Sequence, residues 1–224
     1  MSVHRYRIVR TALGCALVAL SACQMRCRPS PEYTSLMPRD MSPPAPRGLP
    51  VDAIDRLKAA CAQSNQEACM GLGTVFERGN GVPKDESAAR KIYSDCCQAK
   101  NSKCCYNEAM MASEGRGGPP DYPKARQLFE SSCADGMGPA CNNLGAMVFN
   151  GEGSPRDAAL AATWYKKGCD LDNATACTAL GVQYAEGTGV TASPAKASEY
   201  LSKGCAKGSK AACELLSRAR VVPR

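Results

Sequence analysis

Cysteine is the residue whose number and spacing in this 224-residue chain most directly suggest chemistry. There are 15 cysteines, and most of them form pairs that are eight positions apart. Such thiols can either bond to each other or bind a metal ion. A tetrahedral zinc site needs four ligands and usually has its cysteines separated by about two to four residues, which a C-x7-C pair does not provide. Because so many cysteines without metal-ligand spacing are unusual in a reduced cytosolic protein, they predict an oxidising compartment.

Histidine, on which many enzymes and metal sites depend, occurs once in the chain. This histidine is His4, within the leader described below, so the mature protein contains no imidazole. This excludes Ser-His-Asp and Cys-His catalysis and every histidine metal site. We expect neither a metal nor a cofactor.

The first 22 residues have the features of a secretion signal. Residues 1–10 carry three arginines and no acidic residue, and the apolar run 11–20 is about half as long as a bilayer-spanning helix. The run ends in Leu-Ser-Ala-Cys, which resembles a bacterial lipobox, where a cysteine receives lipid before cleavage. We expect residues 1–22 to be removed and Cys23 to become a lipidated N-terminus. The alternative is an ordinary cleavage that leaves Cys23 free.

The segment after this cysteine is expected to be a tether. Gln24 stands where an aspartate would favour the inner membrane, so we expect an outer-membrane lipoprotein that faces the periplasm or the cell surface. Residues 23–50 contain seven of the chain's 15 prolines, which predicts a Pro-rich linker. A repeat domain is expected at 51–220 and a short tail at 221–224.

The charge of the chain gives no sign of a nucleic-acid partner. Without residues 1–22 the chain has 25 basic and 21 acidic residues, a net charge of +4. It contains no run of Lys or Arg and no alternation of basic and aromatic residues.

A period of 36 residues runs through the domain. The leading cysteines of the pairs recur at this interval, and each has its partner eight positions later: Cys61 and Cys69, Cys97 and Cys105, Cys133 and Cys141, Cys169 and Cys177, Cys205 and Cys213. An alanine stands eight residues before each leading cysteine, and a Leu, Tyr or Phe stands four before it. This spacing marks one face of a helix.

A second helix is expected to begin near each trailing cysteine. Three residues after it lies a leucine in four of the five repeats, usually followed by glycine. A G-x-G triplet and often a proline then follow, as in Gly79-Asn80-Gly81 and Gly115-Arg116-Gly117. Because these triplets follow a helix rather than a strand, we interpret them as helix ends and not as phosphate-binding loops. The predicted fold is an all-α solenoid of about five helical hairpins.

These residues resemble a known family, the SEL-type repeats, which are similar to tetratricopeptide repeats. Within it they resemble the disulfide-rich branch called Helicobacter-type cysteine-rich proteins. The resemblance covers residues 51–220 and depends on the C-x7-C pairs, the Leu-Gly step and the stretch 79–85. The second repeat departs from it, with Glu108-Ala109 in place of Leu-Gly, which puts its local packing in doubt.

The cysteine pairs fit disulfide bonds across the tight turn between two helices. Each bond closes a small ring, which stabilises the chain by about 2 to 3 kcal/mol in the chain-entropy model. Cys96 and Cys104 add a second such pair beside the one at Cys97 and Cys105. A second disulfide, a four-thiolate metal site and a redox-exchanging cluster all remain possible there. Cys27 has no partner, so it is either free or links two copies of the chain.

The resemblance also implies a weak penicillin-binding or beta-lactamase activity, which has been attached to the disulfide-rich branch. Ser193-Pro-Ala-Lys196 fits the S-x-x-K motif of such enzymes, but their S-D-N and K-T-G motifs are absent from the sequence. Ser-Pro is also an ordinary helix start. We therefore expect no catalytic residue, and the sequence favours a protein without enzymatic activity.

Stacked hairpins form a curved surface whose inner side can bind a partner. The resemblance to tetratricopeptide repeats implies that positions on either side of the Leu column face this groove, namely Met70, Thr74, Tyr106, Met110, Asn142, Phe149 and Thr178. Such a groove suits an extended peptide or protein segment. The expected function is that of a lipid-anchored adaptor of the bacterial envelope; the alternatives are the beta-lactamase activity and a thiol or metal function of the doubled cysteines. The sequence does not indicate the oligomeric state.

Overall fold

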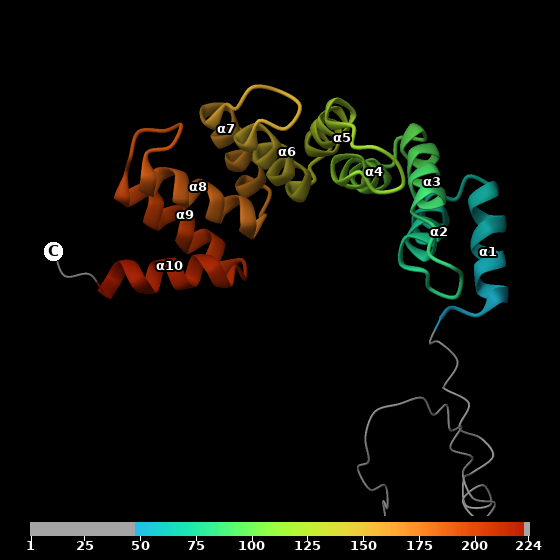
Figure 1. Ribbon diagram of the computed structural model, residues 1–224. Coiled ribbons are helices and arrows are strands. Elements are labelled where there is room, and N and C mark those ends of the chain that lie inside the picture. Colours follow the sequence, from blue (N-terminus) through green and yellow to red (C-terminus); the bar gives the residue numbers. More distant parts are fainter. Residues whose placement is uncertain (1–47, 222–224) are drawn as a thin grey trace, which may run out of the picture. The chain divides into compact units, whose positions relative to one another are not determined.

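The computed structural model describes residues 48–221, and the expected signal peptide, the lipidated Cys23, Cys27 and most of the linker lie outside this range. All regular structure within it is helical (Figure 1). The helices are α1 (Val51–Ala62), α2 (Gln66–Arg78), α3 (Glu86–Gln98), α4 (Ser102–Glu114), α5 (Tyr122–Ala134), α6 (Gly138–Asn150), α7 (Ala158–Asp170), α8 (Ala174–Glu186), α9 (Pro194–Ala206) and α10 (Lys210–Val221). The predicted all-α repeat fold is therefore confirmed.

Short polar side chains begin most of these helices. The side chains of Asn65, Asn101 and Asn173 accept hydrogen bonds from backbone N–H groups in the first turns of α2, α4 and α8. Asp85, Asp121 and Asp157 do the same for α3, α5 and α7. Each contact satisfies a donor that the helix itself leaves unpaired.

Glycine ends the helices that carry the trailing cysteines. The first glycine of each G-x-G triplet has left-handed backbone geometry, with φ between 69° and 79° at the ends of α2, α4, α6 and α8. A side chain is strained in this conformation, so glycine is favoured there. The interpretation of the triplets as helix ends is correct.

Helices joined by a G-x-G loop pack closely against each other. The glycine after the Leu column lies against a large side chain of the following helix: Gly145 of α6 faces the ring of Tyr165 in α7, and a Cβ on this glycine would lie 2.8 Å from the ring. Gly181 faces Leu201 in the same way. The missing side chain lets the two helices approach, and the large residues opposite are buried.

Disulfide bonds join one such helix pair to the next. Each of the six bonds links cysteines eight residues apart across a short turn, with Cα atoms 4.5 to 5.7 Å apart. The predicted C-x7-C disulfides are thus present. Helices on the two sides of these turns share less contact than those joined by G-x-G loops. The covalent bonds therefore lie where packing between helices is less extensive.

The helix pairs follow one another along a curve. In Figure 1, α4 and α6 lie on the inner side of this curve, and α5 and α7 lie on the outer side. The contact between α6 and α8 agrees with this arrangement, because elements on an inner side come closer together. No helix in the range 48–221 is long and apolar enough to cross a membrane.

A disulfide that closes a turn alone should contribute more to stability than one that lies beside a second disulfide in the same turn. Replacing Cys169 and Cys177 with alanine opens a ring and should lower the free energy of unfolding by about 2 to 3 kcal/mol. Replacing Cys96 and Cys104 should cost less than half as much, because Cys97–Cys105 already closes that turn.

Urea denaturation of both double variants under non-reducing conditions would measure this difference. The comparison is matched because all four replaced cysteines are similarly buried, at 6% or less exposed. Equal losses would show that the disulfides act through local packing rather than through ring closure.

Candidate functional site

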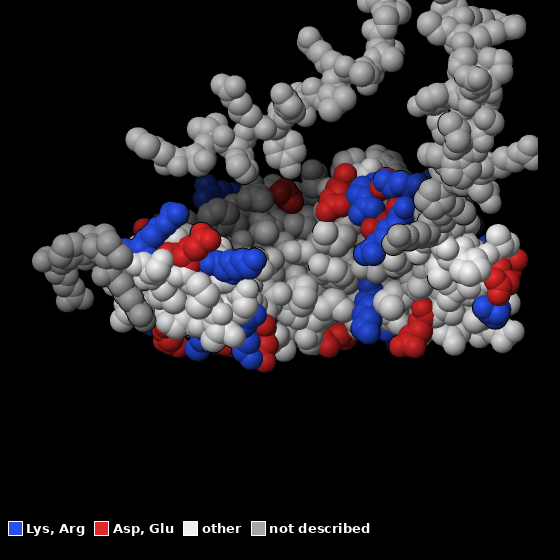
Figure 2. Space-filling model, turned by 90° about the horizontal axis from the view of Figure 1, so that it is seen from below, with Lys and Arg blue, Asp and Glu red and all other residues white. Residues whose placement is uncertain are grey.

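The side chains predicted to line a groove lie on the helices of the inner row. All seven are half-buried, at positions on α2, α4, α6 and α8. Figure 2 looks at the inner side of the curve, where much of the visible surface is uncharged and Lys or Arg residues lie beside Asp or Glu residues in mixed groups. The face is thus neither strongly basic nor strongly acidic.

Two of these residues use their hydroxyl groups inside the fold. The Thr74 hydroxyl donates to the carbonyl of Met70 and lies 3.0 Å from the hydroxyl of Tyr93. The Thr178 hydroxyl lies 2.7 Å from the carbonyl of Ala174 and 2.9 Å from the Ser209 hydroxyl. These two threonines therefore contribute to helix packing and have little hydrogen-bonding capacity left for a partner.

The middle of the inner face is built around Asn143. Its amide nitrogen lies 3.3 Å from the hydroxyl of Tyr106 and 3.0 Å from the sulfur of Met110, so α6 is bridged to α4. The ring of Tyr106 also packs edge-on against Phe129, with ring centres 5.7 Å apart. The structure thus brings together Tyr106 and Met110, and adds Asn143.

Sequence reasoning named the neighbouring Asn142 and missed Asn143. The Asn142 amide donates to the Asn143 side-chain oxygen at 3.2 Å, so the two residues act together. The expected groove positions were implied by the resemblance to tetratricopeptide repeats, and here the bridging residue directly precedes Leu144. The available signal was the asparagine that directly precedes the Leu column in the second and third repeats, Asn107 and Asn143.

A small cavity lies between α4 and α6 beside this bridge. It has a volume of about 160 Å³. Its lining comprises Met110, Ser113, Phe129, Asn143, Ala146, Met147, Asn150 and Glu152. Phe129 and Met147 are almost completely buried and form its apolar base. Glu152, the central residue of the third G-x-G triplet, is its charged component.

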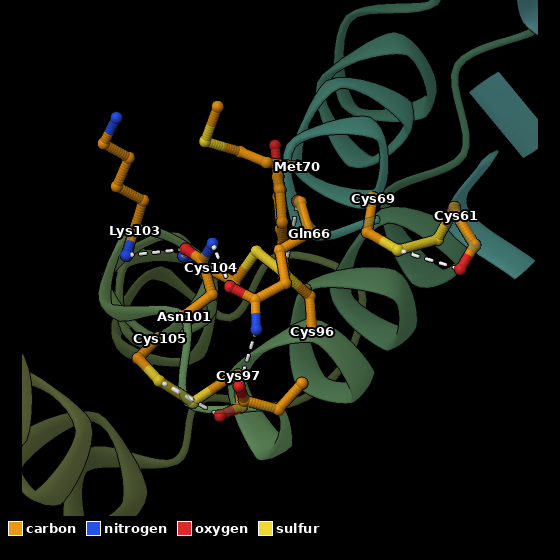
Figure 3. Close-up of a disulfide and its surroundings, with 12 residues drawn as sticks. Cys61, Gln66, Cys69, Met70, Cys96, Cys97, Asn101, Lys103, Cys104 and Cys105 are labelled. Atoms are coloured by element: carbon orange, nitrogen blue, oxygen red, sulfur yellow. Dashed lines mark hydrogen bonds between the residues drawn. A yellow bond between two sulfur atoms is a disulfide. The ribbon is translucent and has the colours of Figure 1, made fainter. Parts of the chain in front are cut away.

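The other predicted groove residues lie apart from this cavity. Met70 lines a separate hollow of about 430 Å³ with Lys100, Lys103 and Asp135. Figure 3 shows Met70 and Lys103 pointing away from the disulfides. The ring of Phe149 is covered by the guanidinium of Arg156, 4.6 Å from the ring centre.

The doubled cysteines form two adjacent disulfides, Cys96–Cys104 and Cys97–Cys105 (Figure 3). The side chain of Gln66 lies beside them, donating to the carbonyl of Ala99 at 2.8 Å and accepting from Asn101 at 3.1 Å. In this oxidised form none of the four sulfurs is a thiolate that could bind a metal. Within residues 48–221, no group of three or more His, Cys, Asp or Glu is arranged to hold a metal ion.

Each of the two residues that define the S-x-x-K match, Ser193 and Lys196, makes a contact within the fold. The Ser193 hydroxyl accepts a hydrogen bond from the backbone N–H of Lys196, which makes it the N-cap of α9. The Lys196 ammonium lies 5.0 Å from the centre of the Tyr184 ring. Both residues of the S-x-x-K match thus have structural explanations.

Arg116 forms an ion-pair network between the first two helix pairs. Its guanidinium lies 2.8 Å from Glu77 at the end of α2 and 3.1 Å from Glu86 at the start of α3. Burial alone would lower the pKa of Arg116, but hydrogen bonds to Glu77 and Glu86 outweigh it and raise the pKa. Hydrogen bonds from Lys84 and Arg116 lower the pKa of Glu86. The central residue of this G-x-G triplet therefore links consecutive repeats.

Glu108, the departure from the Leu column, is accommodated as an ion pair. Its side chain is 2% exposed, and its carboxylate meets the ammonium of Lys124 on α5. Since an unpaired buried charge is costly, Lys124 compensates for the missing leucine. Ala109, which follows Glu108 in place of glycine, is fully buried.

Comparison with known proteins supports the fold described above. A family model for the Sel1 repeat matches residues 66–94, 102–137, 138–173 and 174–209. The chain belongs to the Sel1 repeat family. The four matched repeats correspond to α2–α3, α4–α5, α6–α7 and α8–α9, so the disulfides join one Sel1 repeat to its neighbour.

Solved structures show similar repeats. A protective antigen of uropathogenic Escherichia coli with an SLR fold is 26% identical, with a TM-score of 0.70; the match covers 74% of this chain and 35% of that one. A Sel1 repeat protein from Oxalobacter formigenes is 24% identical, with a TM-score of 0.69 and coverage of 75% and 70%. Helicobacter pylori cysteine rich protein B is 28% identical, with a TM-score of 0.49 and coverage of 59% and 96%.

The chain thus spans about a third of the length of the E. coli antigen. No curated protein matches it. Sel1 repeat proteins are generally scaffolds for protein interactions.

Two buried tyrosines should make the protein less stable at high pH. Burial raises the pKa of Tyr93 and of Tyr165 to about 12, from an ordinary value of 10. Because both tyrosines ionise more readily in the unfolded chain, the free energy of unfolding should be unaffected by them below pH 10 and should fall as the pH rises towards 12.

Urea denaturation at a series of alkaline pH values would measure this fall. A Tyr93→Phe/Tyr165→Phe variant should show a smaller one, whereas Tyr122→Phe, at an exposed position, should behave like the parent protein. An identical pH dependence in the double variant would contradict the assignment.

Proposed function

We propose that this protein is a lipid-anchored adaptor of the bacterial envelope that binds an extended segment of a partner protein on the inner face of its Sel1 repeats. The observation that carries the proposal is the arrangement of Tyr106, Met110 and Asn143, which places aromatic, thioether and amide groups side by side on half-buried positions of α4 and α6. Groups of this kind combine apolar contact area with hydrogen bonding to a peptide backbone.

The position of this cluster supports a role in binding rather than in folding alone. Its apolar base, Phe129 and Met147, is buried, while Tyr106, Met110 and Asn143 remain partly accessible. A bound peptide can take the place of the Asn143 amide as the hydrogen-bond partner of the Tyr106 hydroxyl. Partly exposed tyrosines in such surroundings are frequent anchors of protein interfaces.

Anchoring to the outer membrane is the second part of the proposal. It is supported by the lipobox-like sequence that ends at Cys23 and by a cysteine content that suits an oxidising compartment. All twelve cysteines within the described range are paired in disulfides, which fits the periplasm or the cell surface. The Pro-rich linker would separate the repeats from the membrane.

Removal of the central cluster should abolish partner binding. The full chain is cross-linked to its partners in the membrane and captured in mild detergent. The amount of partner captured with Tyr106→Ala/Asn143→Ala should be at least about 10-fold lower than with the parent chain, as expected for the loss of an interface anchor. Quantitative mass spectrometry of the cross-linked partners measures the effect.

A matched control is Leu160→Ala/Leu171→Ala, which removes two exposed apolar side chains, one from the first turn of α7 and one directly after this helix. It should keep its partners. Equal capture by the cluster variant and the parent protein, with unchanged thermal unfolding of both, would contradict a binding role for the inner face.

Lipidation should depend on Cys23 alone. In cells grown with labelled palmitate, the parent chain should incorporate label, and Cys23→Ser should incorporate none because the acceptor thiol is missing. Cys27→Ser is the matched control and should be labelled normally. Incorporation by Cys23→Ser would exclude the lipoprotein part of the proposal.

A further inference from the structure

We infer that the cavity between α4 and α6 is a specificity pocket for a Lys or Arg side chain of the bound segment. The inference rests on the proposed function of the inner face and names the chemistry of its partner. It combines three observations, which are the size of the cavity, its apolar base and the carboxylate of Glu152 in its lining.

The cavity is open to solvent, and its size suits one long side chain. Its volume is about 160 Å³, and a cavity of about 150 Å³ in another protein accepts a molecule the size of benzene. A single long side chain fits such a space, whereas a helix or a folded element does not. The cavity also lies beside Tyr106 and Asn143, so a segment crossing the inner face can place a side chain into it.

The base of the cavity favours an aliphatic or aromatic stem. Phe129 is 1% exposed and Met147 is 3% exposed, and Met110 and Ala146 are partly buried around them. The flexible side chains of Met110 and Met147 can adapt their shape to that of a bound side chain. An unbranched stem of methylene groups would therefore pack against this base.

The carboxylate of Glu152 selects a positively charged end on that stem. The Asn150 amide donates to one of its oxygens at 3.1 Å, and within the described residues no cation forms an ion pair with it. Arg156 of the same loop lies over Phe149 instead. A purely apolar side chain would remove water from this carboxylate without compensation, whereas Lys and Arg bury a methylene stem and present a charge at its end.

The central residues of the other G-x-G loops are not acidic. The corresponding central residue of the first loop, Asn80, accepts a hydrogen bond from the backbone of Leu49. Arg116 of the second loop is held by Glu77 and Glu86, and Thr188 of the fourth contacts Glu186. Glu152 is thus the acidic member of this set, and it lies next to an apolar cavity.

A positional peptide library tests the pocket directly. The probes are nine-residue peptides with randomised flanks and a fixed central Lys, Arg, Gln, Glu or norleucine, and the protein is the purified full chain in detergent. We expect Lys and Arg peptides to bind about 5- to 10-fold more tightly than norleucine peptides, as for the gain of one partly screened ion pair.

Variants of Glu152 should change this preference in a defined direction. Glu152→Gln should abolish it while norleucine peptides bind as before, and Glu152→Lys should favour central Glu. The control is Glu130→Gln, which removes the same charge from an exposed position of α5 outside the cavity and should leave the preference intact.

The outcomes separate this inference from the proposed function. Binding that is lost in Tyr106→Ala but shows no preference for Lys or Arg, or a preference that persists in Glu152→Gln, overturns the pocket and leaves the binding face standing. Binding that is unaffected by Tyr106→Ala, or no binding of any peptide, overturns both. Thermal unfolding of each variant, followed by circular dichroism, verifies that the fold is retained.

Discussion

The short turn closed by a disulfide is the constraint on which the arrangement of the repeats depends. In five of the six bonds the Cα atoms are 4.5 to 4.8 Å apart, so the helices on either side are held at nearly the same separation at each junction. Identical junctions add successive helix pairs with the same rotation, which produces a regular curve. The inner face therefore results from a repeated local geometry, and contacts between repeats such as that of Asn143 with Tyr106 add to it.

Close packing within each Sel1 repeat complements these covalent junctions. Glycines such as Gly145 and Gly181 let the two helices of a repeat approach until a large side chain of the second helix is buried. Small residues and half-cystines make up much of the core, where Ala125, Ala161, Cys133 and Cys141 are fully buried. This explains how a chain with only 5% aromatic residues forms a stable row of helices.

Much of the fold could be predicted from the sequence because its signals are periodic and local. The 36-residue interval shows that one unit recurs along the chain, and each G-x-G triplet acts within a few residues of the helix that it ends. The composition of the inner face was harder to predict, because it depends on side chains from different repeats. Tyr106 and Met110 lie together in its centre, but Thr74 and Thr178 are used in packing. Asn143 and Glu152 line one cavity with Met110, and this grouping becomes visible only when α4 and α6 are placed side by side.

The local pairing of the cysteines also has a consequence for biogenesis. Since each bond joins residues eight positions apart, its two thiols are close together even in the unfolded chain, and every crosslink can form independently of the other repeats. Oxidation can thus proceed in the order of the chain, without shuffling between distant thiols. The doubled turn is the exception, because Cys96 and Cys97 meet Cys104 and Cys105 at the same moment and have two alternative pairings. It is the place where an isomerase would have most to correct.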